Sequence, residues 1–154
     1  MIGLSHAGIS VPDIDAAIAW YTTVLGFHVL EGPFDIDDSS PTAAVARDIY
    51  GPRWHRMRQA HLAADDGAGI ELFQFLEPEE AAAGPPFRYW HPGLFHVCVV
   101  SPDVGALAAR IAEHGGRQTT QVHRPSPRYL LCYCQDPWGN AIEINDQPYT
   151  KAHG

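Results

Sequence analysis

The stretch HAGISVPDIDAAIAWYTTVLG, residues 6–26, decides the fold because the chain repeats it. Sliding the sequence against itself by 90 positions places this stretch, without a gap, on HVCVVSPDVGALAARIAEHGG, residues 96–116. A second match, at an offset of 72, aligns Ile70-Glu71-Leu72 with Ile142-Glu143-Ile144. Two copies are too few for a solenoid, so the repeat predicts one domain of two related modules. The aligned pairs of the first match include His6/His96, Pro12/Pro102, Asp13/Asp103 and Gly26/Gly116.

Each copy predicts the same order of elements: one strand, one helix and three strands. The opening stretches GLSHAGISV and GLFHVCVV alternate as strands do, and Asp13 and Asp103 then stand where a carboxylate favours the start of a helix. Glycines at 26 and 115–116 are typical helix stops. The pattern predicts an α+β fold of two βαβββ modules in tandem. The three later strands are expected at 27–32, 58–64 and 69–76 in the first module, and at 117–123, 128–135 and 140–145 in the second.

The whole chain, 1–154, is expected to form this single domain. The first module is about 18 residues longer than the second, and the region 32–57 is the expected place of the excess. The polar tail is predicted to hold no element of its own. The predicted boundaries are about 1–76 for module one, 77–91 for the linker, about 92–146 for module two and 147–154 for the tail.

Composition excludes several classes of protein. Apolar residues make up 45% and charged residues 18% of the chain, which excludes a coiled coil, a collagen-like chain and a disordered one. The net charge of −8 argues against nucleic-acid binding. No apolar run approaches the ~20 residues of a membrane helix, and the three cysteines form no CxxC pair. We therefore expect a cytoplasmic protein with a small-molecule substrate and neither nucleic acid nor membrane as partner.

Two histidines and two glutamates coincide in the repeat. His6 and His96 fall in the first strand of each module, and Glu71 and Glu143 in the last. A lone carboxylate among apolar strand residues is costly unless it is paired or binds a metal. If the modules are related by pseudo-symmetry, all four side chains converge, and two imidazoles with two carboxylates suit a divalent cation. The alternative to a metal site is that both histidines are ordinary half-buried residues and both glutamates lie on exposed strand faces.

With these residues in view, the chain resembles the vicinal oxygen chelate superfamily, the glyoxalase/bleomycin-resistance/dioxygenase proteins. The resemblance covers nearly the whole chain and rests on HAGISVPDIDAAIAWYTTVLGF, GIELFQF, FHVCVVSPDVGALAARIAEHGG and DPWGNAIEI. It implies two βαβββ modules whose mixed sheets form an open, curled barrel around one divalent metal ion. The ligand pattern of glyoxalase I and methylmalonyl-CoA epimerase implies His6, Glu71, His96 and Glu143 as ligands. Nickel, cobalt, manganese, iron, zinc and magnesium all remain open.

The resemblance also implies a reaction class and an assembly. In this family the metal stabilises negative charge on a chelated substrate, as in an enolate, and a glutamate ligand moves the proton. Glu71 and Glu143 are equal candidates for this base, which predicts a lyase or isomerase. Family members take their ligands from one chain or from two, and a homodimer is expected here.

One detail argues against glyoxalase I itself. The arginine that helps to hold glutathione there has no counterpart in HAGISVPD, which carries Ser10 and no cation. Arginines of the extra segment either contact an anionic substrate or are solvated surface residues. These arginines are Arg47, Arg53, Arg56 and Arg58.

Two other functions stay open. An Fe(II) extradiol ring-cleaving dioxygenase would use His6, His96 and Glu143 as its triad, with Tyr133 as a catalytic residue and His123 nearby. A drug-binding resistance protein would instead hold its ligand in an aromatic cleft, although the same aromatic residues suit a core. Cys98 either borders the site or is a small buried hydrophobe. The aromatic candidates are Trp54, Phe73, Phe75, Tyr89, Trp90 and Trp138; histidines 28, 55, 61, 91, 114 and 153 receive no role.

Overall fold

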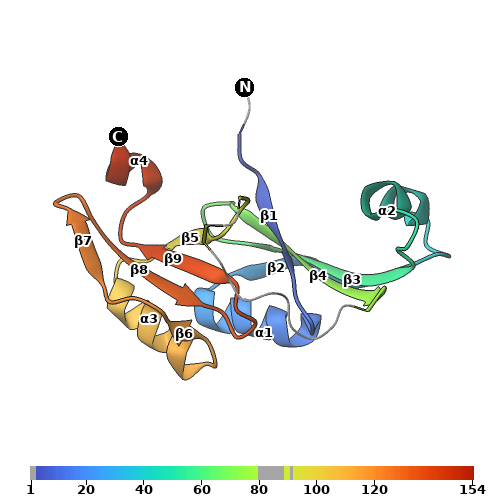
Figure 1. Cartoon of the computed structure of the whole chain (residues 1–154), viewed down its shortest axis with the longest axis horizontal. Helices are drawn as coiled ribbons and strands as arrows, with labels where there is room; N and C mark the ends of the chain where they lie inside the picture. Colours follow the sequence, from blue (N-terminus) through green and yellow to red (C-terminus); the bar gives the residue numbers. More distant parts are fainter. Residues whose placement is uncertain (1–2, 80–88, 91) are drawn as a thin grey trace. The chain divides into compact units, whose positions relative to one another are not determined.

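The computed structural model describes residues 3–79, 89–90 and 92–154 (Figure 1). The chain forms two compact units, Met1–Gly84 and Pro85–Gly154. Each unit holds one of the predicted modules, so the α+β fold of tandem βαβββ modules is confirmed. The predicted linker lies mostly outside the described residues, and its first residue, Glu77, ends a strand. No helix in the described part of the chain is long and apolar enough to cross a membrane.

The first unit is a four-stranded sheet with two helices. Its strands run in the order β1-β4-β3-β2, with β1 parallel to β4 and the other neighbours antiparallel. The first and last strands of the module are therefore direct neighbours. The elements are β1 (His6–Ser10), α1 (Ile14–Leu25), β2 (His28–Asp37), α2 (Ala43–Tyr50), β3 (Arg56–Ala63) and β4 (Gly69–Glu77).

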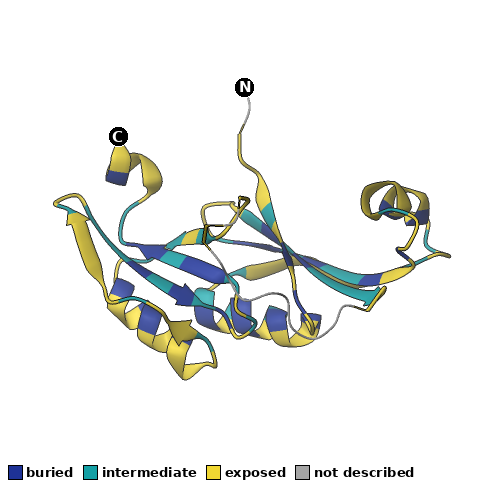
Figure 2. Ribbon diagram, viewed as in Figure 1, coloured by how far each residue is buried: buried dark blue, intermediate teal, exposed yellow. Residues whose placement is uncertain are grey.

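Helix α1 forms where the sequence predicts it. The Asp13 side chain accepts hydrogen bonds from the backbone N–H groups of Asp15 and Ala16, which caps the helix, and Gly26 ends it with a φ of 77°. The helix contacts β2, β3 and β4, and its buried residues are Ile14, Ala17, Trp20, Tyr21 and Val24. Figure 2 shows the burial along one side of the helix.

The two faces of this sheet differ in character. One face carries the buried aliphatic residues of β3 and β4, among them Leu62 and Leu72. The opposite face carries Glu71, Phe73 and Phe75, because alternate strand residues point the same way. We call this second side the carboxylate face. Helix α2 covers one end of it through a cluster of Ala43, Ala46, Trp54 and Met57, against which Ile36, Phe73 and Phe75 pack.

The second unit repeats the first without the counterpart of α2. Its sheet has the order β5-β9-β8-β6, with β7 paired to β8, and β5 runs parallel to β9. Helix α3 is capped by Asp103, whose carboxylate accepts from the Ala106 N–H. The elements are β5 (Val97–Val100), α3 (Val104–Glu113), β6 (Arg117–Gln118), β7 (His123–Ser126), β8 (Tyr129–Gln135), β9 (Ala141–Asn145) and α4 (Tyr149–His153).

Strand register confirms the internal repeat at the level of single residues. Glu71 lies opposite Gly8 in the parallel pair of unit one, and Glu143 lies opposite Cys98 in that of unit two. Gly8 and Cys98 are aligned by the 90-residue repeat, and each follows its module's histidine by two positions. The two modules therefore place their histidine and glutamate in the same relation.

Three expectations about elements were wrong. Strand β2 does not end at Gly32 but continues to Asp37, because register shifts around Glu31 and Phe34 let pairing resume beyond the glycine. The stretch 117–123 is not one strand: it holds β6, and β7 begins only at its last residue. The tail forms helix α4, which buries Ala152.

Candidate functional site

The first histidine–glutamate pair lies on the carboxylate face of unit one. His6 Nε2 is 3.3 Å from Glu71 Oε2, and the His6 Nδ1 lies 3.2 Å from the Ser5 hydroxyl oxygen. Gly69 makes this approach feasible, since a Cβ built there would stand only 3.1 Å from His6 Cβ. The Glu71 side chain is 23% exposed. A small residue at the start of β4 thus leaves room for the imidazole beside the carboxylate.

A second histidine, His61, completes the surroundings of Glu71. His61 lies directly opposite Glu71 in the antiparallel β3–β4 pair, and its Nδ1 is 3.2 Å from Glu71 Oε1. His6 approaches the other oxygen, Oε2, so an imidazole contacts each oxygen of the carboxylate. The Phe34 ring packs beside His61, with centroids 6.4 Å apart.

The second pair belongs to unit two. His96 was expected within the opening strand, but it immediately precedes β5. Its Nε2 is 3.0 Å from Glu143 Oε2. Its ring packs edge-on against Phe95 and Tyr133, with centroid distances of 4.4 Å and 5.4 Å. Nδ1 of His96 is buried and has no hydrogen-bond partner among the described residues. The Glu143 side chain is only 13% exposed, so this pair is the more enclosed of the two.

Glu143 is also held by side chains of β8 and β9. The Tyr133 hydroxyl donates to Glu143 Oε2 at 3.3 Å, and the Asn145 amide donates to Oε1 at 3.4 Å. Burial and the charge of Glu143 raise the pKa of Tyr133 to about 12, so the phenol is a hydrogen-bond donor at neutral pH and not a base. This contact supports a positioning role for Tyr133.

Cys98 borders the second pair. The Asn145 amide that binds Glu143 also lies 3.6 Å from Cys98 Sγ. Burial, followed by the charge of Glu143, raises the pKa of the Cys98 thiol to about 11. The thiol is therefore neutral at physiological pH and lacks the thiolate character of a nucleophile.

The sequence interpretation missed His61. It was given no role because no other histidine matches it, yet the 72-residue offset that aligns the two glutamates also aligns His61 with Tyr133. Both residues lie opposite their module's glutamate across an antiparallel strand pair. The 72-residue offset, extended towards the N-terminus, pairs His61 with Tyr133 although the two residues differ in type.

Each pair has the spacing of two neighbouring metal ligands. Two donors in adjacent octahedral positions, with bonds of about 2.1 Å, stand about 3.0 Å apart. The Nε2–Oε2 distances of 3.3 Å and 3.0 Å are close to that value, and imidazole with carboxylate is a common donor set. Within the described ranges, no group of three or more His, Cys, Asp or Glu is arranged to hold a metal ion.

Three of the four candidate arginines form ion pairs. Arg58 pairs with Asp15 at 2.6 Å and lowers the pKa of that carboxyl. Arg47 pairs with Asp38 at 2.6 Å. Arg56 lies 3.5 Å from Asp35. Arg53 differs, since no ion pair involves it in the described part of the chain.

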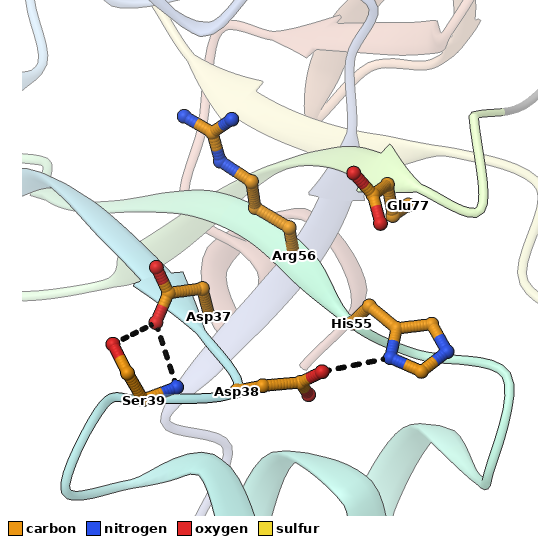
Figure 3. Close-up of a pocket in the computed structure, with 6 residues that line it drawn as sticks. All are labelled: Asp37, Asp38, Ser39, His55, Arg56 and Glu77. Atoms are coloured by element: carbon orange, nitrogen blue, oxygen red, sulfur yellow. Dashed lines mark hydrogen bonds and ion pairs between the residues drawn. The ribbon is translucent and has the colours of Figure 1, made fainter.

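A polar pocket of about 270 Å³ lies where β2 leads into the segment of α2 (Figure 3). Asp38 accepts from His55 there at 2.9 Å, and the hydrogen bonds from His55 and Arg47 lower the pKa of the Asp38 carboxyl. These contacts tie both ends of the α2 segment together, which is a structural role. The lining residues are Asp37, Asp38, Ser39, His55, Arg56 and Glu77.

His123 does not lie with Tyr133 beside Glu143 in the described structure. It is exposed at the start of β7, opposite Leu131, and no hydrogen bond or ion pair of the described residues links it to Glu143. The expected place of a further dioxygenase-type histidine is therefore not confirmed.

The aromatic candidates do not share one environment. Trp54 is buried, Phe73 and Phe75 stack on β4, Tyr89 and Trp90 are exposed, and Trp138 is partly buried. Trp54 and Phe75 also line a second pocket, of about 230 Å³, beside α2.

The fold and the paired sites define a protein of two βαβββ modules, each carrying one histidine–glutamate pair. The chain belongs to the Glyoxalase/Bleomycin resistance protein/Dioxygenase superfamily, whose family model matches residues 3–144. A glyoxalase family protein from Bacillus cereus has the same fold: its crystal structure gives a TM-score of 0.79 at 23% identity, over 94% of this chain and 93% of that one.

Curated relatives include two epimerases and one dioxygenase, all of them enzymes. A 2-epi-5-epi-valiolone epimerase of an Actinomyces species is 24% identical over 96% of this chain and 80% of its own length. An ethylmalonyl-CoA/methylmalonyl-CoA epimerase of Cereibacter sphaeroides is 32% identical over 76% of this chain and 75% of its own. A catechol-2,3-dioxygenase of Bacillus subtilis is 27% identical over 92% of this chain, which spans 40% of that enzyme.

Proposed function

We propose that the chain is a divalent-metal-dependent isomerase or lyase that acts on a small, oxygen-rich substrate. The observation that carries the proposal is the matched geometry of the two pairs, His6–Glu71 and His96–Glu143, in equivalent positions of the repeat. The two epimerases among the relatives support the isomerase class. A four-donor centre would take one pair from each unit. When bound, the metal supplies Lewis-acid stabilisation of negative charge that develops on the substrate oxygen.

Within this proposal, Glu71 is the base. Its carboxylate is more exposed than that of Glu143, and neighbouring imidazoles contact both of its oxygens. It takes a proton from the substrate carbon next to a carbonyl, which leaves an enolate-like substrate and a protonated Glu71. Return of the proton to carbon completes an isomerisation, and departure of a leaving group from the enolate completes a lyase reaction. Glu143 is held by Tyr133 and Asn145 and keeps its position.

Solvent exchange tests this assignment. Metal-loaded protein in deuterium oxide is mixed with a panel of 2-oxo acids, acyl-CoA thioesters and the methylglyoxal–glutathione adduct, and deuterium at carbon is followed by NMR. Glu71→Gln should lower the exchange rate by at least about 100-fold, since general-base catalysis contributes ~10²–10⁴-fold. Glu113→Gln, an exposed glutamate of α3, is the matched control and should not change it. Exchange that persists in Glu71→Gln would contradict the role of Glu71.

A ring-cleaving dioxygenase is the second candidate, supported by the catechol-2,3-dioxygenase relative and by the Tyr133–Glu143 hydrogen bond. The protein is loaded with Fe(II) without oxygen, mixed with catechols and exposed to air. A yellow ring-fission product that is lost in Tyr133→Phe and His96→Ala would favour this function over an isomerase.

We further propose that the protein works as a homodimer. Mixing His6→Ala with His96→Ala tests whether a site takes its pairs from two chains. A mixed dimer would then hold one site with both histidines, and activity would reappear on mixing. If each site lies within one chain, every site of the mixture lacks a histidine, and activity would stay absent. Size-exclusion chromatography with light scattering gives the oligomeric state directly, and a monomer would contradict the homodimer.

A further inference from the structure

The pocket beside α2 lies on the same face of the first sheet as Glu71. It has a volume of about 230 Å³, below the ~300–1,000 Å³ of pockets that enclose a whole ligand. It therefore suits one end group of a substrate. Its lining comes from the end of α2, the loop that follows and the end of β4: Tyr50, Arg53, Trp54, Phe75 and Pro78.

A continuous aromatic surface joins the candidate ligand to this pocket. Glu71, Phe73 and Phe75 share the carboxylate face, and the two phenylalanine rings stack 6.1 Å apart. Tyr50 of α2 meets both rings edge-on, at 6.2 Å and 5.2 Å. Burial, and then the charge of Glu71, raise the pKa of Tyr50, which is consistent with its place near the site. Four strand residues correspond to about 13 Å, so the pocket lies that far along the strand from Glu71.

The pocket also places a cation beside an indole that forms part of its wall. Trp54 is 1% exposed and its Nε1 is itself buried, so the indole packs into the wall of the pocket. Arg53 stands beside it and takes part in no ion pair of the described chain, in contrast to Arg47, Arg56 and Arg58. A guanidinium that forms no ion pair in the described chain, set beside the aromatic walls of Tyr50 and Phe75, suits an acceptor that is negatively charged.

We propose that this pocket binds an anionic oxygen group, a carboxylate or a phosphate, at the far end of the substrate whose reacting carbon lies at Glu71. The inference rests on the proposed function for the reacting end. It names the substrate class: a small acid with a planar or apolar body between the reacting carbon and a second, distal anion. The extra segment of module one, which has no counterpart in module two, supplies the specificity for that distal group.

Binding to the pocket can be measured without metal or turnover. The four tryptophans give four indole N–H signals in a ¹⁵N-labelled sample of the full chain, and Trp54→Phe assigns the one from Trp54. Phenylacetate and phenyl phosphate are titrated beside neutral phenylacetamide. Because the indole lines the pocket, the Trp54 signal should shift and saturate with the anions, with at least about tenfold weaker binding of the amide. The tighter of the two anions identifies the distal group.

Arginine variants provide the control. Arg53→Gln should weaken anion binding by about tenfold or more, while Arg56→Gln, three residues along the same segment, should leave it unchanged. An unmoved Trp54 signal, or equal effects of the two arginine variants, would overturn the inference.

The link to catalysis is tested in the deuterium-exchange assay. Substrates that carry a distal carboxylate or phosphate should have a lower KM than matched substrates in which that group is fully esterified and neutral, and Arg53→Gln should remove this preference. Exchange without any preference would overturn the pocket's role in substrate binding. Absence of exchange with every substrate would instead contradict the proposed function, and the indole titration would still decide whether the pocket binds anions.

Discussion

Replacing Tyr133 with phenylalanine removes one hydrogen bond from Glu143 and changes little else. The Glu143 side chain is 13% exposed and has three polar contacts, with His96 at 3.0 Å, Tyr133 at 3.3 Å and Asn145 at 3.4 Å. A hydrogen bond to a charged group contributes about 1.5–3 kcal/mol, and a contact at 3.3 Å belongs at the low end. We therefore expect Tyr133→Phe to lower the free energy of unfolding by about 1–1.5 kcal/mol at pH 7.

Urea unfolding of the metal-free protein measures this loss, and Tm should fall by about 2–5 °C. Tyr129→Phe is the matched control: Tyr129 lies on the same strand, and its hydroxyl makes no hydrogen bond within the described residues. Metal binding should survive in Tyr133→Phe, because the four proposed ligands are intact and only the position of Glu143 is less constrained. Equal stability of the two variants would refute the reasoning, and loss of the metal would show that Tyr133 does more than position the carboxylate.

Three further predictions concern parts of the chain that support the site. Gly69→Ala should weaken metal binding by about tenfold, as disturbed supporting residues commonly do, because the added Cβ would stand 3.1 Å from that of His6; titration with Co(II) measures it. Asp38→Asn should destabilise the protein more at pH 7 than at pH 2. Hydrogen bonds from His55 and a neighbouring arginine lower the Asp38 pKa in the folded protein. The stabilisation is therefore present above the unfolded pKa of about 3.9 and is lost as the pH falls through the lower, folded pKa. A difference that stays constant in urea unfolding at both pH values would contradict this cause. Asp13→Ala should cost about 1 kcal/mol of stability through the lost cap of α1, and thermal unfolding that matches the unaltered protein would show that the cap contributes nothing.

The repeat made most of the fold predictable. Helices α1 and α3 can be predicted because each begins after an aspartate, has apolar residues along one side and is followed by a glycine. In the strands of each module, apolar and polar residues alternate. Helix α2 was not predicted, since its segment has no second copy for comparison and its buried side chains are only two alanines, Ala43 and Ala46. Helix α4 was missed for a similar reason: five residues with one buried alanine carry no periodic signal.

The candidate site was predictable where the repeat conserves residue type. His6 and His96 match each other, as do Glu71 and Glu143, and the structure brings each histidine to its module's glutamate. His61 was not predicted because the position that matches it in the second module holds a tyrosine, Tyr133, and not a histidine.

The pocket beside α2 could not be predicted from the sequence. It depends on tertiary contacts that bring the extra segment onto β4, so that Trp54 and Phe75 share one wall. Those contacts leave no signal in the sequence.

The central claim is that both histidine–glutamate pairs bind one divalent metal ion. Metal content of protein purified without chelators, measured for the unaltered chain, His6→Ala, His96→Ala and the control His28→Ala, tests it most directly. We expect about one ion per chain in the unaltered protein and in His28→Ala, whose exposed imidazole lies on β2. His6→Ala and His96→Ala should each retain much less metal, because the loss of one ligand lowers the affinity by about tenfold or more. Unchanged metal content in both His6→Ala and His96→Ala would contradict the claim.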